Sequence, residues 1–264
     1  MPENDLADTG LLVAAVREAG TIARHFYGGT YKSWQKSKGN PVTEADIAID
    51  DFLKKTLLAA RPDYGWLSEE SIDDPARLAR ARIFVVDPID GTYGFLKQRP
   101  HFTIVATVVE KGRPVSGAIY NPITEEMYEA AYGAGAQLNG KPIHVSGQSD
   151  FPHMRLLAEK AVTDSTRWTV PWPASIVAET RASAAYRMAL VAAGEFDAMI
   201  SLSRKADWDI AAGDLIVTEA GGRVTTRSGD TQVYNQANPV HRNIICAGPA
   251  LHARLIERMR DLRE

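Results

Sequence analysis

The sequence predicts an α/β fold of the α+β type, with an antiparallel sheet in its first half and a smaller α/β part in its second. Two stretches near the start, 11–27 and 41–60, have helical periodicity. They are followed by β-branched apolar runs separated by short turns, and then by alternating helix and strand patterns. We expect residues 1–150 to form an N-terminal α+β subdomain and residues 151–264 a C-terminal α/β subdomain.

The first half opens with two amphipathic helices. The first is predicted over 11–27 and ends at Gly28-Gly29, because glycine suits the C-terminal end of a helix. The second begins after the polar run 36–40 and reaches about Ala60. Its expected apolar face consists of Ile47, Phe52, Leu53, Leu57 and Leu58.

The strands of the first half follow these helices. The apolar stretch 83–86 is typical of a buried strand, and the runs 102–109 and 114–120 flank a turn and predict a hairpin. Further strands are expected at 127–131 and 135–138, the second of which leads into the tight-turn pair Asn139-Gly140.

The second half is predicted to alternate helices and strands after an irregular start. Segment 150–175 contains Pro152, Pro171 and Pro173, so we expect an irregular passage between the two subdomains. The patterns that follow predict helices at 183–193, 208–220 and 250–264 and strands at 196–200 and 223–226. The Arg-rich face of the last helix is interpreted as a solvated surface.

Composition excludes several classes of function. The net charge of −3 and the dispersed Lys and Arg residues provide no basic stripe, so we expect no nucleic-acid polymer as a partner. No stretch reaches the roughly 18 apolar residues of a membrane span, and the acidic start lacks a signal-peptide pattern. We expect a cytoplasmic protein without a membrane partner. The single cysteine, Cys246, lies in an apolar run and is predicted to be a buried thiol.

Two carboxylates leave the end of the predicted strand 83–86 together, in the run Asp87-Pro88-Ile89-Asp90-Gly91-Thr92. Pro88 disfavours a helix at Asp87, and Gly91 lets the backbone approach a ligand closely. Mg²⁺ prefers oxygen ligands and commonly binds between one or two carboxylates and the phosphate of a substrate. The run therefore indicates phosphoryl chemistry, although Asp-Pro and Asp-Gly also form ordinary turns.

Acidic residues elsewhere could complete such a site. Ser68-Glu69-Glu70-Ser71 precedes the run, and Asp209 stands at the start of the predicted helix 208–220. Acidic residues at these positions could instead have purely structural roles. A carboxylate at a helix start, such as Asp209, caps free N–H groups, and Thr43 with Asp46 has the spacing of a capping box.

Four ordered motifs resemble those of the inositol monophosphatase family. They are Asn40-Pro41-Val42-Thr43-Glu44-Ala45-Asp46, Ser68-Glu69-Glu70-Ser71, Asp87-Pro88-Ile89-Asp90-Gly91-Thr92, and Trp208-Asp209-Ile210-Ala211-Ala212-Gly213 with Gly221-Gly222. The resemblance covers nearly the whole chain. It implies a lithium-sensitive, Mg²⁺-dependent phosphatase with a layered α-β-α-β-α sandwich fold, acting on small phosphorylated substrates and forming a homodimer.

The resemblance also implies a ligand set for two to three Mg²⁺ ions. The first ion would be held by Glu69, Asp87 and the backbone carbonyl of Ile89. The second would be held by Asp87, Asp90 and Asp209. A third, weaker ion would depend on Glu69 and, through water, on Asp46.

Roles in catalysis and substrate binding are implied in the same way. Backbone N–H groups of Gly91 and Thr92 would hold phosphate oxygens, and the Thr92 hydroxyl, linked to Asp46, would take a proton from the attacking water. Thr92, Asp46 and Glu69 are therefore the expected catalytic residues. Ser183 and Arg187 would line the leaving-group pocket beside Asp209.

The resemblance favours one branch of substrates. Leu202 occupies the position, seven residues before Asp209, at which inositol-selective members have a glutamate. Segment Phe95-Leu96-Lys97-Gln98-Arg99 resembles bacterial members of the 3′(2′),5′-bisphosphate nucleotidase branch. We expect a nucleotide bisphosphate as substrate. Inositol 1-phosphate and histidinol phosphate are alternatives, as is a catalytically silent binding relative.

Overall fold

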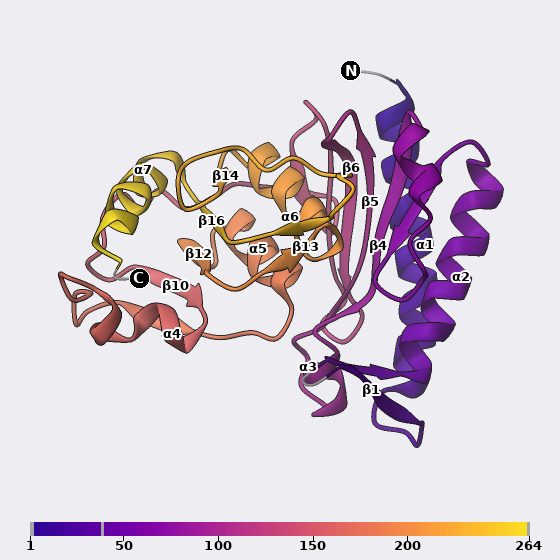
Figure 1. The fold of residues 1–264 in the computed structure, drawn as a ribbon, viewed down its shortest axis with the longest axis horizontal. Coiled ribbons are helices and arrows are strands. Elements are labelled where there is room, and N and C mark those ends of the chain that lie inside the picture. Colours follow the sequence, from indigo (N-terminus) through magenta and orange to yellow (C-terminus); the bar gives the residue numbers. More distant parts are fainter. Residues whose placement is uncertain (1–2, 38–39, 263–264) are drawn as a thin grey trace.

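Five layers, in the order α-β-α-β-α, make up the structure (Figure 1). It is a computed structural model that describes residues 3–37 and 40–262. Helices α1 (Glu3–Phe26) and α2 (Glu44–Ala60) form the first layer and pack on the larger sheet. The predicted fold class and layering are confirmed.

The larger sheet has seven strands in the order β3-β4-β5-β6-β7-β8-β9. The strands are β3 (Gly65–Ser68), β4 (Arg82–Asp90), β5 (Thr103–Glu110), β6 (Arg113–Asn121), β7 (Glu126–Ala131), β8 (Ala136–Leu138) and β9 (Lys141–Ile143). β3 and β4 are parallel and every other pairing in this sheet is antiparallel. The predicted hairpin is β5–β6, and the predicted tight turn joins β8 to β9.

Helices α5 (Ala184–Ala192) and α6 (Asp207–Glu219) form the middle layer, between the two sheets (Figure 1). The second sheet has the order β11-β10-β12-β16-β14. Its strands are β10 (Arg155–Ala158), β11 (Val177–Glu179), β12 (Ala198–Ser201), β14 (Arg223–Thr225) and β16 (Ile244–Ala247). Helices α4 (Lys160–Thr163) and α7 (Pro249–Arg258) cover its outer side.

Short elements complete the chain. They are the hairpin β1 (Ser33–Ser37) and β2 (Asn40–Thr43), helix α3 (Thr92–Leu96), the two-stranded pair β13 (Lys205–Ala206) and β15 (Val240–His241), and the 3₁₀ turns Pro75–Ala79, Ser165–Arg167 and Met259–Asp261.

Three apolar clusters fill the spaces between layers. One joins α1 and α2 to the large sheet, one joins that sheet to α5 and α6, and one lies between the second sheet and α7. Cys246 is buried in β16, as expected, and burial raises the pKa of its thiol to about 12. Within residues 3–37 and 40–262, no helix is long and apolar enough to cross a bilayer.

Two predictions for the first-layer helices are wrong in detail. Helix α1 begins at Glu3 rather than at residue 11, because Arg82 pairs with the buried Asp5 and Asp8 and lets polar residues continue the helix. Ile47 is 36% exposed and does not belong to the buried face of α2, which instead includes Ile49.

The second half also departs from two predictions. Segment 150–175 contains β10, which lies between β11 and β12 in the second sheet. Four residues are too few to show a strand period, and the Arg155–Asp197 ion pair that fixes β10 beside β12 is not visible in sequence. The last helix ends at Arg258, which is buried rather than solvated and lies 4.0 Å from the Trp172 ring centroid.

Candidate active site

The Asp-rich run forms the end of strand β4. Pairing between β4 and β5 is regular up to Asp87 and shifts register between Asp87 and Asp90. Such bulges redirect side chains and are common beside active sites. Because of this register shift, the carboxylates of Asp87 and Asp90 both point away from the sheet at the end of β4.

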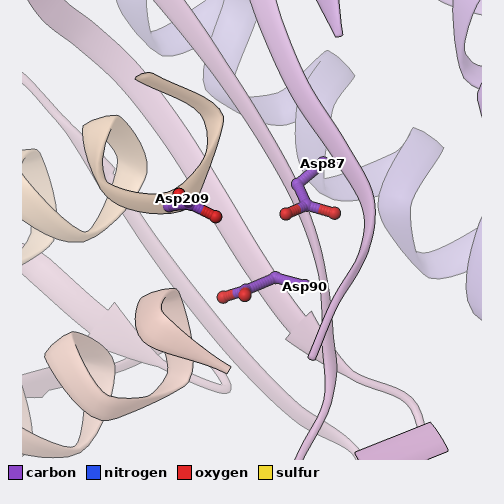
Figure 2. Close-up of side chains that lie close together, drawn as sticks. All are labelled: Asp87, Asp90 and Asp209. Carbon is purple, nitrogen blue, oxygen red and sulfur yellow. The ribbon is translucent and has the colours of Figure 1, made fainter. Parts of the chain in front are cut away.

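Asp87 and Asp90 meet Asp209, which comes from the first turn of α6. Figure 2 shows the three side chains turned toward a common space. One carboxylate oxygen from each residue lies within 4.8 Å of the other two. The structure therefore brings together three of the predicted metal ligands from two distant parts of the chain.

Asp87 gives the clearest indication of a cation. Its side chain is buried, and neither carboxylate oxygen has a hydrogen-bond partner among the described residues. A buried carboxylate without partners is costly, whereas a hard divalent ion would satisfy both oxygens. The donor set of three carboxylates thus fits Mg²⁺.

The charges in this cluster repel one another. Burial, followed by the charges of Glu69 and Asp90, raises the pKa of Asp87 well above its ordinary value. Burial and the charge of Asp90 raise the pKa of Asp209 to about 7. Without a cation, the folded protein disfavours full ionisation of the cluster.

Asp90 also caps helix α5. Its Oδ2 accepts hydrogen bonds from the Ser183 hydroxyl and from the Ala185 N–H, both at 2.6 Å, and its Oδ1 accepts one from Ala184 N–H at 3.2 Å. Ser183 is the N-cap residue of α5. These donors fix the Asp90 carboxylate relative to the middle layer.

Asp209 caps its helix and also faces the acidic group. Its Oδ2 accepts a 2.6 Å hydrogen bond from the backbone N–H of Ala206, so the carboxylate caps α6. Its side chain still reaches the space shared with Asp87 and Asp90. The capping bond therefore holds the carboxylate at the site.

Asp46 forms the predicted capping box and also contacts Thr92. Its Oδ2 accepts hydrogen bonds from the Thr43 backbone and hydroxyl, which form the capping box of α2. Its Oδ1 accepts a 3.3 Å bond from the Thr92 hydroxyl, which also lies 3.1 Å from the Ile89 carbonyl oxygen. Burial raises the pKa of Asp46 to about 6.

Gly91 makes the turn that separates Asp90 from Thr92. Its φ of +94° is in the left-handed region, and an added Cβ would lie 2.9 Å from both the His101 carbonyl oxygen and the Ser183 nitrogen. Only glycine fits this close approach.

Glu69 lies just after β3, outside the group of three. Its Oε1 is 3.5 Å from the Lys36 ammonium, which is 2.5 Å from Glu70 Oε1. Its charge nevertheless raises the pKa of Asp87. Burial raises the pKa of the neighbouring Glu70 to about 7.

Sequence reasoning missed Asp50, which anchors this loop. Asp50 is buried in α2 and accepts hydrogen bonds of 2.5 Å from the Ser68 and Ser71 hydroxyls. The sequence could have indicated Asp50 by its spacing from Asp46, because the two residues are four positions apart and share a helix face.

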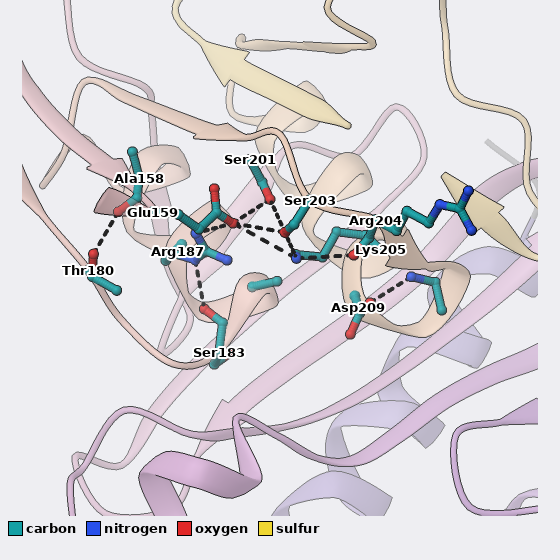
Figure 3. A network of polar contacts seen from close by, with 12 residues as sticks. Ala158, Glu159, Thr180, Ser183, Arg187, Ser201, Ser203, Arg204, Lys205 and Asp209 are labelled. Carbon is teal, nitrogen blue, oxygen red and sulfur yellow. Dashed lines mark hydrogen bonds and ion pairs between the residues drawn. The ribbon is translucent and has the colours of Figure 1, made fainter. Parts of the chain in front are cut away.

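A second polar cluster lies beside the acidic group (Figure 3). Glu159 Oε1 is 3.4 Å from Arg187 Nη1 and 3.9 Å from Lys205 Nζ, and it accepts a bond from the Ser201 hydroxyl at 2.5 Å. Burial raises the pKa of Glu159, but Arg187 and the other donors outweigh it, so the net shift is downward. Sequence reasoning identified Arg187 here but missed Lys205 and Glu159.

Both cations of this cluster act on the acidic group. Burial raises the pKa of Asp90 and that of Asp209, and the charges of Arg187 and Lys205, respectively, oppose these upward shifts. By contrast, Lys97 and Arg99 are exposed, with the Lys97 ammonium above the Tyr93 ring. Leu202 is half-buried and packs against the apolar cluster that lies between the second sheet and α7.

Comparisons with known proteins agree with this architecture. The family model described as "Inositol monophosphatase family" matches residues 7–264. "Inositol monophosphatase 2" of Solanum lycopersicum is 34% identical over 231 residues, which are 82% of this chain and 86% of that protein. "Inositol-1-monophosphatase" of Rhizobium meliloti is 34% identical over 232 residues, which are 83% and 85% of the two chains. The crystal structure of the extragenic suppressor protein suhB from Bartonella henselae superposes with a TM-score of 0.84 at 28% identity, covering 96% of this chain and 98% of that one.

Proposed function

The chain belongs to the inositol monophosphatase family, whose members are Mg²⁺-dependent phosphatases of phosphate monoesters, and we propose that it prefers a 3′(2′),5′-bisphosphate nucleotide as substrate. The relatives described above carry inositol monophosphatase names. The preference for a nucleotide is therefore an inference from this chain's own residues.

We assign the metal ligands to the acidic group. Asp87, Asp90 and Asp209 would hold one ion, and Asp87, Glu69 and the Ile89 carbonyl would hold another. The unpartnered oxygens of Asp87 support this assignment most directly. Bound there, Mg²⁺ supplies the Lewis acidity that activates a water molecule and neutralises charge on the leaving oxygen.

The remaining assignments concern the proton and the phosphate. The Thr92 hydroxyl relays the proton of the attacking water to Asp46, whose pKa of about 6 suits a proton acceptor near neutral pH. The backbone N–H groups of Gly91 and Thr92 bind phosphate oxygens, which the close turn at Gly91 permits. Two to three ions and a homodimer are also expected from the family.

The substrate preference depends on one observation. The cluster beside Asp209 contains two cations, Lys205 and Arg187, but a single carboxylate, Glu159. The excess positive charge suits a leaving group that carries a second phosphate, because lysine and arginine bind phosphate through charge-assisted hydrogen bonds. We assign Ser183 and Arg187 to the leaving-group site beside Asp209.

The test is a comparison of phosphate release from 3′-phosphoadenosine 5′-phosphate, 2′-AMP, inositol 1-phosphate and histidinol phosphate at saturating Mg²⁺. We expect the highest kcat/KM for 3′-phosphoadenosine 5′-phosphate and a lower value for 2′-AMP, which lacks the second phosphate. An equal or higher kcat/KM for inositol 1-phosphate would overturn the substrate preference and leave the phosphatase activity intact.

A further inference from the structure

Residues 232–241, here called the strap, hold the N-terminal end of helix α6. His241 and Val240 of β15 pair with Lys205 and Ala206 of β13, directly before the helix. The backbone N–H of Asp207 donates a 3.0 Å hydrogen bond to Pro239. The strap therefore lies against the helix turn that carries Asp209.

The His241 ring is held at both of its nitrogens. Its Nε2 is 2.7 Å from Asp207 Oδ1, and its Nδ1 is 2.9 Å from Gln232 Oε1. The Gln232 amide nitrogen donates to the Asn243 carbonyl at 3.0 Å, which sets the amide orientation and turns its oxygen toward the ring. The ring therefore connects Asp207 at the start of α6 to the beginning of the strap.

The contacts of His241 lie in a buried part of the structure. Asp207 is fully buried, and His241 is 9% exposed. Asp214 lies two turns after Asp207 in α6, and its Oδ2 accepts a 2.6 Å hydrogen bond from Tyr234, whose ring centroid is 5.1 Å from that of His241. Lys205 directs its ammonium toward Ser203 and Glu159.

The strap also connects α6 with the segment that follows Glu69. Asp207 Oδ2 accepts a 2.7 Å bond from the Asn235 N–H, and the Asn235 side chain accepts one from the buried Arg77. Arg77 is paired in turn with Asp73. One chain of partly buried polar contacts thus links the two segments that carry proposed metal ligands.

We propose that His241 is a positioning residue that fixes the first turn of α6 and thereby the Asp209 carboxylate. Asp207 and Asp209 belong to the same helical turn, and Asp209 is bonded to Ala206, which pairs with the neighbour of His241. Loss of the His241 ring would leave Asp207 Oδ1 buried without this partner and would loosen the turn. The inference rests on the proposed role of Asp209 as a metal ligand.

Calorimetric titration with Mg²⁺ tests the positioning role. We expect His241→Asn to weaken Mg²⁺ binding about tenfold, the effect typical of residues that orient a metal ligand, with kcat at saturating Mg²⁺ changed much less. The matched control is His252→Asn, which removes a buried histidine from α7 and should leave Mg²⁺ affinity unchanged. Unchanged affinity in folded His241→Asn would contradict the proposal.

A second variant covers the case in which His241→Asn does not fold. Gln232→Met removes the hydrogen-bond partner of His241 Nδ1 and leaves Asp207 in place, so it should weaken Mg²⁺ binding, though less than His241→Asn does. Unchanged Mg²⁺ affinity in folded Gln232→Met would contradict the positioning role of the His241 ring. Failure of the wild-type protein to bind Mg²⁺ would instead refute the proposed function.

Discussion

The Asp90 carboxylate accepts a 2.6 Å hydrogen bond from the Ser183 hydroxyl, which joins the end of β4 to the first turn of α5. The two residues are 93 positions apart. Ser183 also accepts a bond from the Tyr186 N–H as the helix N-cap, and its hydroxyl lies 3.0 Å from that of Thr103. One hydroxyl therefore caps the helix and orients a proposed metal ligand.

Ser183→Ala should impair both roles. Loss of the N-cap should lower the free energy of unfolding by about 0.5–2 kcal/mol. Loss of the donor to Asp90 should raise the Mg²⁺ concentration for half-maximal activity about tenfold. Urea unfolding and Mg²⁺ titration of phosphate release measure the two effects. A stability loss without any change in the Mg²⁺ requirement would show that Ser183 only caps the helix.

Asp87→Asn should stabilise the metal-free protein at neutral and alkaline pH. Because burial and neighbouring charges raise the pKa of Asp87 in the folded state, the folded protein retains a proton that the unfolded chain has lost. Stability therefore falls as the pH rises above the ordinary carboxyl value of 3.8. In EDTA near pH 8, we expect the variant to be more stable than the wild type by about 1–3 kcal/mol.

Thermal unfolding at several pH values measures this effect. The difference between Asp87→Asn and the wild type should grow as the pH rises from about 4 to about 8 in EDTA. Saturating Mg²⁺ should raise the melting temperature of the wild type but not that of the variant. An equal response of both proteins to Mg²⁺ would remove Asp87 from the ligand set.

Lys205→Met should affect one class of substrate. Removing the ammonium should lower kcat/KM for 3′-phosphoadenosine 5′-phosphate about 10–100-fold, the value of a charge-assisted contact. The kcat/KM for inositol 1-phosphate should change less than about threefold, since that substrate has no second phosphate. The control is Arg204→Met, because the Arg204 side chain extends away from Glu159 (Figure 3). Equal losses for both substrates would argue against a contact with the second phosphate.

Arg258→Lys should destabilise the C-terminal layer. The Arg258 guanidinium lies 4.0 Å from the Trp172 ring centroid and 5.0 Å from that of Trp168, and it donates to the Val170 carbonyl at 2.7 Å. Lysine cannot reproduce this stacking, so we expect a loss of about 1–2 kcal/mol in urea unfolding. Arg254→Lys, on the exposed side of α7, should cost much less. Comparable losses in the two variants would contradict the stacking argument.

Much of the fold was predictable because its signals are local. The β5–β6 hairpin and the helices α5 and α6 each show a clear period and a turn or cap residue within a short window. Strand β10 has four residues, and its position depends on the distant Asp197. The start of α1 depends in the same way on Arg82, so neither feature has a local signal.

The residues of the candidate site fall into the same two groups, those with a local signal in the sequence and those without one. Asp87 and Asp90 were identifiable because one short run holds both, and Asp209 because it stands at a helix start. Asp50, Glu159 and the strap were missed, because their importance arises from contacts made across the fold. Sequence reasoning also presented capping and site roles as alternatives for Asp46 and Asp209, whereas the two oxygens of a carboxylate allow both.

The most direct test of the account is phosphate release from 3′-phosphoadenosine 5′-phosphate by the wild type and by Asp90→Asn, each with Mg²⁺ and with EDTA. We expect activity only in the wild type with Mg²⁺, and a loss of about 10³-fold or more in the variant with its circular dichroism unchanged. Activity of the wild type in EDTA, or retained activity in Asp90→Asn, would contradict a metal site built on Asp87, Asp90 and Asp209.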